Sequence, residues 1–180
     1  FSQSVQGQTT CFESGYNTSK ICHTPYLFEQ VKIGTELKMS DPTGKFTLPK
    51  DITGDVCFIA TGAGIAPFRG MIFELLMSDF KGNVHLIFGN KYEKDVLYYD
   101  EWRHWESHFK NFKFYLCLSR ESKEIKGSFK GFVHPVYQQL FKNNLDTKFF
   151  ICGRSDMINE SKKNLLEMGI PKEMVHFENY

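Results

Sequence analysis

The pattern of apolar and polar residues changes character near residue 50 of the 180-residue chain. Beyond it, short apolar runs alternate with longer runs whose apolar residues recur three and four positions apart. Five short runs predict buried strands, at residues 56–60, 84–88, 112–118, 149–152 and 175–177. Four longer runs predict amphipathic helices, at residues 65–80, 99–109, 132–141 and 157–168. Strands separated by helices predict an α/β fold, a five-stranded parallel sheet with helices on both faces.

The residues before this boundary instead predict short strands joined by turns. Residues 31–39 alternate enough for a strand, and a second short strand is predicted at residues 46–49. Asp41-Pro42-Thr43-Gly44 between them has the chemistry of a turn. This change in the pattern of apolar and polar residues predicts two units, a β-rich one at 1–50 and the α/β unit at 51–180.

A glycine-rich turn follows the first strand of the α/β unit, in the sequence Thr61-Gly62-Ala63-Gly64-Ile65-Ala66-Pro67. Glycines leave backbone amides bare, and amides at the start of a helix bind phosphate or pyrophosphate. The simpler interpretation is a tight turn without a ligand. The usual dinucleotide fingerprint is not met, because Pro67 replaces its third glycine and no acid ends the second strand.

The turns after the other four strands are also distinctive. They are Gly89-Asn90-Lys91, Ser119-Arg120-Glu121, Cys152-Gly153-Arg154 and Glu178-Asn179-Tyr180. Each alone has a structural explanation, such as a helix cap, a small core residue or a frayed chain end. Together they fall at the carboxyl ends of parallel strands, where open α/β sheets bind ligands.

These motifs resemble the ferredoxin–NADP(+) reductase family. The resemblance is carried by T-G-A-G-I-A-P-F-R, L-I-F-G-N-K-Y-E-K-D-V-L-Y-Y-D-E-W, L-S-R-E, I-C-G-R-S-D-M and the terminal V-H-F-E-N-Y, and it covers residues 31–180. The same pattern embraces the NADPH–cytochrome P450 reductase type. Family members have an FAD-binding barrel followed by an NADP(H)-binding domain, so the resemblance implies that residues 1–50 are the end of the barrel and 51–180 the NADP(H) domain.

The resemblance implies a set of NADP(H)-binding residues. They are Thr61, Gly62, Ala63, Gly64, Ile65, Pro67, Gly89, Ser119, Arg120, Lys130, Phe132, Gly153 and Met157. Amides of residues 62–65 would bind the pyrophosphate. Arg120, with Ser119, would bind the 2′-phosphate through charge-assisted hydrogen bonds, and Lys130 falls one residue after the family's second phosphate ligand. Phe132 stands where the family stacks a Tyr on adenine.

Three further residues match the family's catalytic positions, and two match its FAD site. Cys152 and Glu178 would line the nicotinamide pocket, and Tyr180 would stack on the flavin. Cys22 and Thr24 lie in a segment resembling the one beside the FAD phosphates. The family's Arg-x-Tyr-Ser flavin motif does not occur in the chain. We therefore expect a fragment of a longer polypeptide or a natural short form, whose FAD site is incomplete by itself.

The function implied by the resemblance is an FAD-dependent oxidoreductase that passes hydride between NADPH and flavin. Its electrons would go to or come from a redox protein such as ferredoxin or flavodoxin. Two alternatives stay open besides the P450 reductase type. One is a regulatory nucleotide-binding module that has lost the flavin. The other is an NADH-using relative of the cytochrome b5 reductase type. Such relatives lack a basic residue at the position of the ribose phosphate, so Arg120 argues against this alternative.

Composition and charge narrow the classes of protein. A net charge of +1 gives no sign of nucleic-acid binding, and no apolar run has the roughly 20 residues of a membrane helix. The five cysteines are scattered without metal-ligand or disulfide spacing, and the six histidines show none for a metal, so no metal site is expected. Without a signal peptide, a cytoplasmic or plastid protein that is not secreted is expected.

Overall fold

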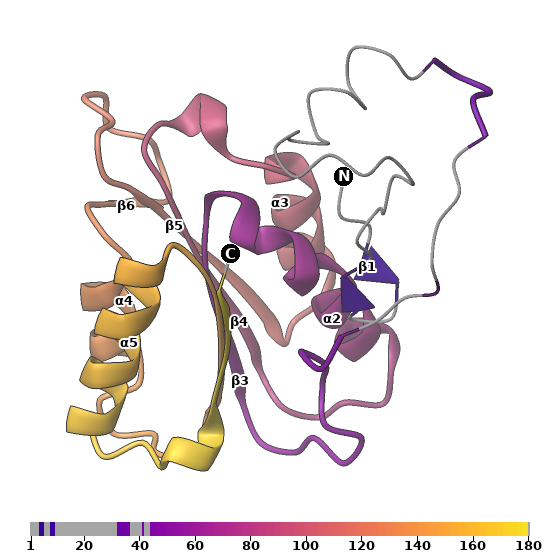
Figure 1. The fold of residues 1–180 in the computed structure, drawn as a ribbon. Coiled ribbons are helices and arrows are strands. Elements are labelled where there is room, and N and C mark those ends of the chain that lie inside the picture. Colours follow the sequence, from indigo (N-terminus) through magenta and orange to yellow (C-terminus); the bar gives the residue numbers. More distant parts are fainter. Residues whose placement is uncertain (1–3, 6–7, 10–31, 37–40, 42–43, 180) are drawn as a thin grey trace, which may run out of the picture.

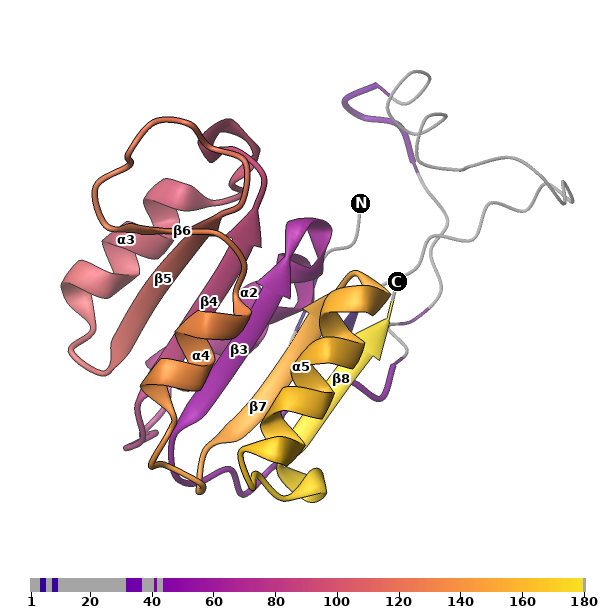
Figure 2. The same ribbon diagram turned by 90° about the vertical axis from the view of Figure 1, so that its left-hand side faces the viewer.

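The structure is a computed structural model that describes residues 4–5, 8–9, 32–36, 41 and 44–179. A twisted six-stranded sheet forms its centre, with all neighbouring strands parallel (Figures 1 and 2). Its strands are β3 (Val56–Thr61), β4 (Val84–Asn90), β5 (Phe112–Leu118), β6 (Ser128–Lys130), β7 (Lys148–Gly153) and β8 (Val175–Asn179). The predicted α/β class and parallel sheet are confirmed.

The strand order is β6-β5-β4-β3-β7-β8. From β3 the chain moves outward through β4 and β5 to β6, and then returns to the other side of β3 to add β7 and β8. The direction of winding therefore reverses between β3 and β7. In open α/β sheets this reversal leaves a crevice outside the carboxyl ends of the strands, because the loops there lead in opposite directions.

Two helices cover each face of the sheet (Figure 2). One face carries α2 (Ala66–Met77) and α3 (Tyr99–His108), and the other carries α4 (His134–Leu140) and α5 (Ser155–Glu167). Alternate strand residues serve the two faces: Phe58 packs with α2 and α3, while Ile59 packs with α4 and α5. Three short 3₁₀ turns, η1 (Gly62–Ile65), η2 (Glu93–Asp95) and η3 (Lys172–Met174), complete the described elements of this unit.

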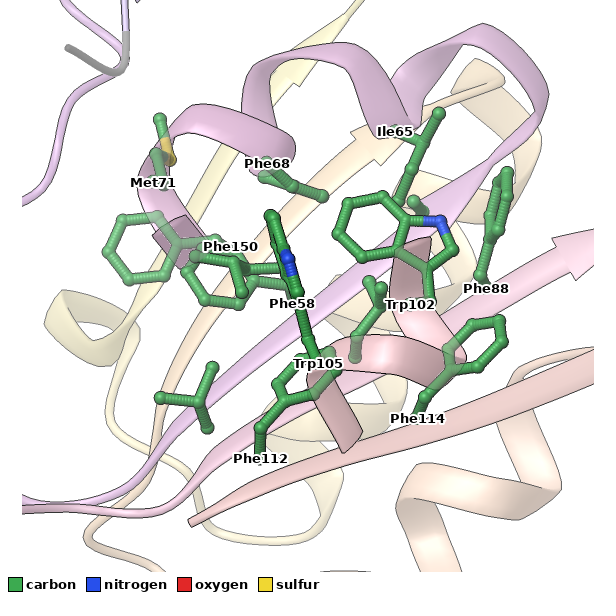
Figure 3. Close-up of a cluster of buried hydrophobic side chains, with 14 of the residues drawn as sticks. Phe58, Ile65, Phe68, Met71, Phe88, Trp102, Trp105, Phe112, Phe114 and Phe150 are labelled. Carbon is green, nitrogen blue, oxygen red and sulfur yellow. The ribbon is translucent and has the colours of Figure 1, made fainter. Parts of the chain in front are cut away.

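Aromatic rings dominate the core beneath α2 and α3 (Figure 3). The rings of Phe58 and Phe150 stack at 5.3 Å, and Trp102 meets Trp105 edge to face at 5.0 Å. Trp102 is fully buried and Trp105 nearly so, as their helical spacing predicts. The Trp102 indole N–H donates to the Leu97 carbonyl at 2.9 Å, which satisfies the polar atom of this buried ring.

The sixth strand corrects the prediction of five. Ser128–Lys130 is an edge strand of three residues, paired only with β5 and largely exposed. Its sequence, S-F-K, holds a single apolar residue. An exposed edge strand needs no apolar run, so the pattern of hydrophobicity does not reveal it.

Two strands predicted before residue 50 are absent from the described residues. Within 31–39, the Thr35 N–H donates to the Lys32 carbonyl at 3.0 Å, and Gly34 has a φ of +92°, so this part is a turn. Residues 46–49 pair with no strand. Phe46 instead packs its ring against Phe68 at 5.9 Å and Phe150 at 6.1 Å, which makes it an extension of the core.

The remaining described part of residues 1–50 contains a minimal antiparallel pair, β1 (Ser4–Val5) and β2 (Gln8–Thr9). The assignment of residues 1–50 to the end of a barrel stays a prediction.

Candidate functional site

A cavity of about 880 Å³ lies at the carboxyl ends of β3, β4, β5 and β7. It spans the point between β3 and β7 where the winding reverses. Ten of the residues predicted to bind nucleotide line it, namely Thr61, Gly62, Ala63, Gly64, Gly89, Ser119, Arg120, Phe132, Gly153 and Met157. The fold therefore gathers residues from four separate strand ends into one site.

The glycine turn forms the centre of this cavity. Gly62 has a φ of +54°, and a Cβ added to it would meet no atom within 4 Å, so the turn is open on that side. A Cβ on Gly64 would overlap the backbone carbonyl of Cys152. Gly62 thus meets the conformational need of the turn, whereas Gly64 allows η1 to lie directly against β7. The turn is tight, and Gly62, Ala63 and Gly64 all line the cavity.

A side-chain hydrogen bond joins the ends of β3 and β7 beside this turn. The Arg154 N–H donates to Thr61 Oγ1 at 3.3 Å. Gly153, with a φ of +146°, passes so close that an added Cβ would overlap the same Oγ1. Thr61 therefore adds a side-chain link just beyond the backbone pairing of the two strands on which the winding reverses.

The opposite wall comes from the ends of β4 and β5. The Ser119 N–H and hydroxyl both donate to the Asn90 carbonyl, at 3.0 and 3.3 Å. The Arg120 N–H donates to the Lys91 carbonyl at 2.9 Å. These bonds extend the pairing of the strands into the loops and place two cationic side chains, Arg120 and Lys91, at the cavity.

Phe132 and His134 supply an aromatic end to the cavity. The Phe132 side chain is 70% exposed, and its ring lies 6.4 Å from that of His134. An exposed aromatic face in the same cavity as the Arg120 and Lys91 cations is suited to a stacked base with a phosphate elsewhere in the cavity.

Five predicted site residues in the described part do not line the cavity. Ile65, the last residue of η1, is fully buried, and Pro67, in the first turn of α2, is also buried. Both side chains therefore point away from the cavity. Lys130 ends the edge strand β6 and is exposed. Cys152 is fully buried, and Glu178 lies opposite it in the β7–β8 register.

Glu178 has an unusual environment for a carboxylate. Its Oε2 is buried and has no hydrogen-bond partner among the described residues. Burial therefore raises the pKa of Glu178, because the charged form loses solvation without gaining a donor. The predicted site residues Cys22, Thr24 and Tyr180 lie outside the described residues.

Ten lining residues were not predicted as ligands. They are Asn90, Lys91, Asp95, Leu97, Gly131, Val133, His134, Arg154, Asp156 and Glu160. Arg154 and Lys91 fall in the strand-end turns that the sequence marks. His134 and Glu160, whose Nε2 and Oε2 lie 3.6 Å apart, belong to different helices, α4 and α5. Only the packing of those helices brings this pair to the site.

The acidic lining residues are partly neutralised. Arg154 Nη2 contacts Asp156 Oδ2 at 2.9 Å, an exposed ion pair at the start of α5. Arg120 and Lys91 have no carboxylate within ion-pair distance among the described residues. Positive charge is thus available at the β4–β5 side of the cavity, away from the β7 side.

This combination of parallel sheet, reversal point, open glycine turn and lateral cations defines a nucleotide-binding α/β domain. Residues 58–163 match the model of the family described as the oxidoreductase NAD-binding domain. The chain therefore belongs to this family, and the resemblance seen in its motifs is confirmed.

Two curated relatives illustrate the match. The chain is 30% identical over 162 residues to one component of the Na(+)-translocating NADH-quinone reductase of Marinomonas sp. (strain MWYL1), covering 86% of this chain and 39% of that protein. It is 30% identical over 158 residues to the anthranilate 1,2-dioxygenase electron transfer component of Acinetobacter baylyi, covering 86% and 45%. The chain thus spans less than half the length of either relative.

Solved structures share the fold. A cytochrome P450 reductase of Amycolatopsis superposes with a TM-score of 0.77 at 22% identity, over 85% of this chain and 46% of that one. The ferredoxin–NADP+ reductase of Plasmodium falciparum superposes with a TM-score of 0.72 at 21% identity, over 96% and 70%.

The domain binds pyridine nucleotide, and its relatives include FAD-binding proteins. In the described part of the chain, every helix is too short or too polar to cross a membrane.

Proposed function

We propose that the chain is the NADP(H)-binding part of an FAD-dependent reductase that exchanges electrons with a protein partner such as ferredoxin or flavodoxin. One observation carries the proposal: a single cavity joins the open Gly62–Gly64 turn to the cationic Arg120 wall. Such a cavity offers one end for a pyrophosphate and another for a ribose phosphate.

The nucleotide fits the residues present. The open side of Gly62 leaves room for phosphate oxygens next to the turn, and the start of α2 adds its dipole. Arg120 binds the 2′-phosphate, with Ser119 beside it and Phe132 against the adenine. Met157 and Gly153 close the β7 side of the cavity. Lys130, outside the cavity lining, contributes at most long-range charge to this recognition.

The reactive end of the nucleotide is assigned to the β7–β8 edge. Cys152 and Glu178 are opposite one another there, so a nicotinamide at this edge meets a small buried thiol and a poorly solvated carboxyl group. FAD, when bound, supplies the hydride exchange and the release of single electrons. By the family resemblance, Tyr180 would cover the flavin ring, and Cys22 and Thr24 would bind the FAD phosphates.

The division of the chain follows from the same proposal. Residues 51–180 form the NADP(H) domain, and residues 1–50 are the end of the FAD-binding barrel. A cytoplasmic or plastid location accords with this assignment.

An NADH-using reductase is the second candidate, favoured by the similarity to a component of an NADH-quinone reductase. The two candidates differ at Arg120, since a cation there has a phosphate partner only in NADP(H). Titrating NADP+ and NAD+ calorimetrically into the wild-type chain separates them. Tighter binding of NADP+ supports the proposal, and equal or tighter binding of NAD+ contradicts the NADP preference.

The location of the site is tested in the same titrations. In ¹⁵N-labelled protein, NADP+ should shift the amide signals of residues 62–64 and 119–120. Shifts confined to the opposite edge of the sheet would contradict a site at the glycine turn.

A further inference from the structure

The Glu121 side chain bridges two loops that form one wall of the cavity, although it does not line the cavity itself. Its Oε2 accepts the Glu93 N–H at 3.3 Å, and its Oε1 accepts the N–H groups of Ser122 at 3.1 Å and Lys123 at 3.4 Å. Glu93 opens η2 in the loop between β4 and α3, whereas Ser122 and Lys123 belong to the loop after β5. One carboxylate therefore accepts hydrogen bonds from both loops.

The position of Glu121 continues the pairing of β4 with β5. The last paired residues in the ladder are Asn90 and Leu118. Beyond them, Ser119 bonds to the Asn90 carbonyl and Arg120 to the Lys91 carbonyl. The Glu121 side chain makes the next link, at the point where backbone pairing between the loops stops.

The β4–α3 loop is fixed at its far end as well. Leu97, which lines the cavity, accepts the Trp102 indole N–H at 2.9 Å. Asp95, at the end of η2, also lines the cavity. Hydrogen bonds therefore hold this loop at two points, from the Glu93 N–H to Glu121 and from the Trp102 indole to the Leu97 carbonyl. The loop that carries Arg120 lies beside it.

We propose that Glu121 is a positioning residue for NADP(H) recognition, whose carboxylate holds the Arg120 loop against η2 and so fixes the Arg120 guanidinium at the cavity wall. This inference rests on the proposed function, because it takes Arg120 as the ligand of the 2′-phosphate. Fixing the loop in advance removes part of the ordering cost of binding, which raises affinity without adding a contact.

A purely electrostatic role for Glu121 would change the affinity for a phosphate in the opposite direction. The hydrogen bond from Glu93, followed by that from Lys123, lowers the pKa of Glu121, so this group is a charged acceptor at neutral pH. A negative charge next to Arg120 repels a phosphate. Considered as a charge alone, its removal should tighten the binding of an anion; considered as a brace, its removal should weaken it.

The test compares 2′,5′-ADP and 5′-AMP by calorimetry on the wild-type chain and its variants. Glu121→Ala should weaken 2′,5′-ADP binding about three- to tenfold, the cost of ordering one long side chain on binding, and leave 5′-AMP affinity unchanged. Glu124→Ala is the matched control, because Glu124 is an exposed acid of the same loop. It should leave 2′,5′-ADP affinity unchanged or tighten it slightly. Glu121→Gln, which keeps one acceptor oxygen, should recover part of the loss.

A double-mutant cycle shows whether Glu121 acts through Arg120. In an Arg120→Ala background, Glu121→Ala should cause no further loss of 2′,5′-ADP affinity. Faster hydrogen exchange at the Glu93 amide, with unchanged exchange in β3 and β4, should accompany the substitution and show that the fold is intact.

Three results would overturn the inference. Tighter 2′,5′-ADP binding by Glu121→Ala, or an equal loss with and without Arg120, excludes the positioning role while the NADP preference stands. Equal wild-type affinity for the two ligands removes the NADP preference itself and the inference with it.

Discussion

Thr61 and Arg154 join the two strands between which the sheet reverses its winding: the Arg154 N–H donates to Thr61 Oγ1 at 3.3 Å. The cavity lies at this same reversal, and both residues line it. The Thr61 hydroxyl thus adds a side-chain link just beyond the β3–β7 ladder, whose last pair is Ala60 and Cys152. The glycine turn and the cavity lie where these two strands, distant in sequence, are joined.

Replacing Thr61 tests this link. Thr61→Val keeps the shape of the side chain but removes the acceptor, so the free energy of unfolding should fall by about 0.5–1.5 kcal/mol, the net value of one hydrogen bond. Thr61→Ser keeps the hydroxyl and is the control. Denaturant unfolding measures both, and equal stability of the Val variant and wild type would show that the hydrogen bond contributes nothing.

Two glycines of the turn should respond differently to the same substitution. Gly64→Ala places a Cβ against the Cys152 carbonyl, so it should cost about 1–3 kcal/mol of folding free energy through backbone displacement. Gly62→Ala meets open space and should cost only about 1–2 kcal/mol for its left-handed conformation.

Nucleotide binding should separate these two variants further. The Gly62→Ala methyl group projects into the open side of the turn and should weaken NADP+ binding in a protein that still folds. Thermal unfolding and NADP+ titration on both proteins measure the two effects. A Gly62→Ala variant with wild-type affinity would contradict a phosphate site at this turn.

The sequence predicts this fold well where its signals are local. Apolar runs locate β3, β4, β5, β7 and β8 because strands of a parallel sheet with helices on both faces are largely apolar, and glycine or charged turns mark where they end. The pattern misses the edge strand β6, whose pairing with β5 buries little. It also misassigns Phe46, whose apolar character reflects packing against Phe68 rather than a strand.

The site is predicted less completely because side-chain direction and tertiary contacts decide its membership. Pro67 follows the glycine turn in sequence, yet it is a buried residue of the first turn of α2 and does not line the cavity. His134 and Glu160 are 26 positions apart and become neighbours only when α4 packs beside α5. No local pattern encodes that adjacency.

Arg120 should determine the preference for a 2′-phosphate. Arg120→Ala should weaken 2′,5′-ADP binding by about 1.5–3 kcal/mol, the value of a hydrogen bond to a charged group, and leave 5′-AMP binding unchanged. Lys123→Ala is the matched control, since it removes one exposed positive charge from the same loop. Calorimetry gives each affinity, and an equal loss in both variants would point to general charge rather than a specific contact.

Glu178 predicts a dependence of stability on pH. Burial raises its folded-state pKa above the ordinary value of 4.5, so the folded protein holds this proton more tightly than the unfolded chain does. The wild-type protein should therefore lose stability relative to Glu178→Gln as pH rises through the folded pKa, and the difference should vanish below the unfolded pKa.

The Gln variant keeps the shape of the side chain without the charge, so the comparison isolates the buried carboxylate. Glu173→Gln, on the exposed η3 turn, is the control and should show no such dependence. Urea unfolding of the three proteins from pH 4 to pH 8 measures the effect, and a Gln variant whose advantage stays constant over that range would show that Glu178 is well solvated.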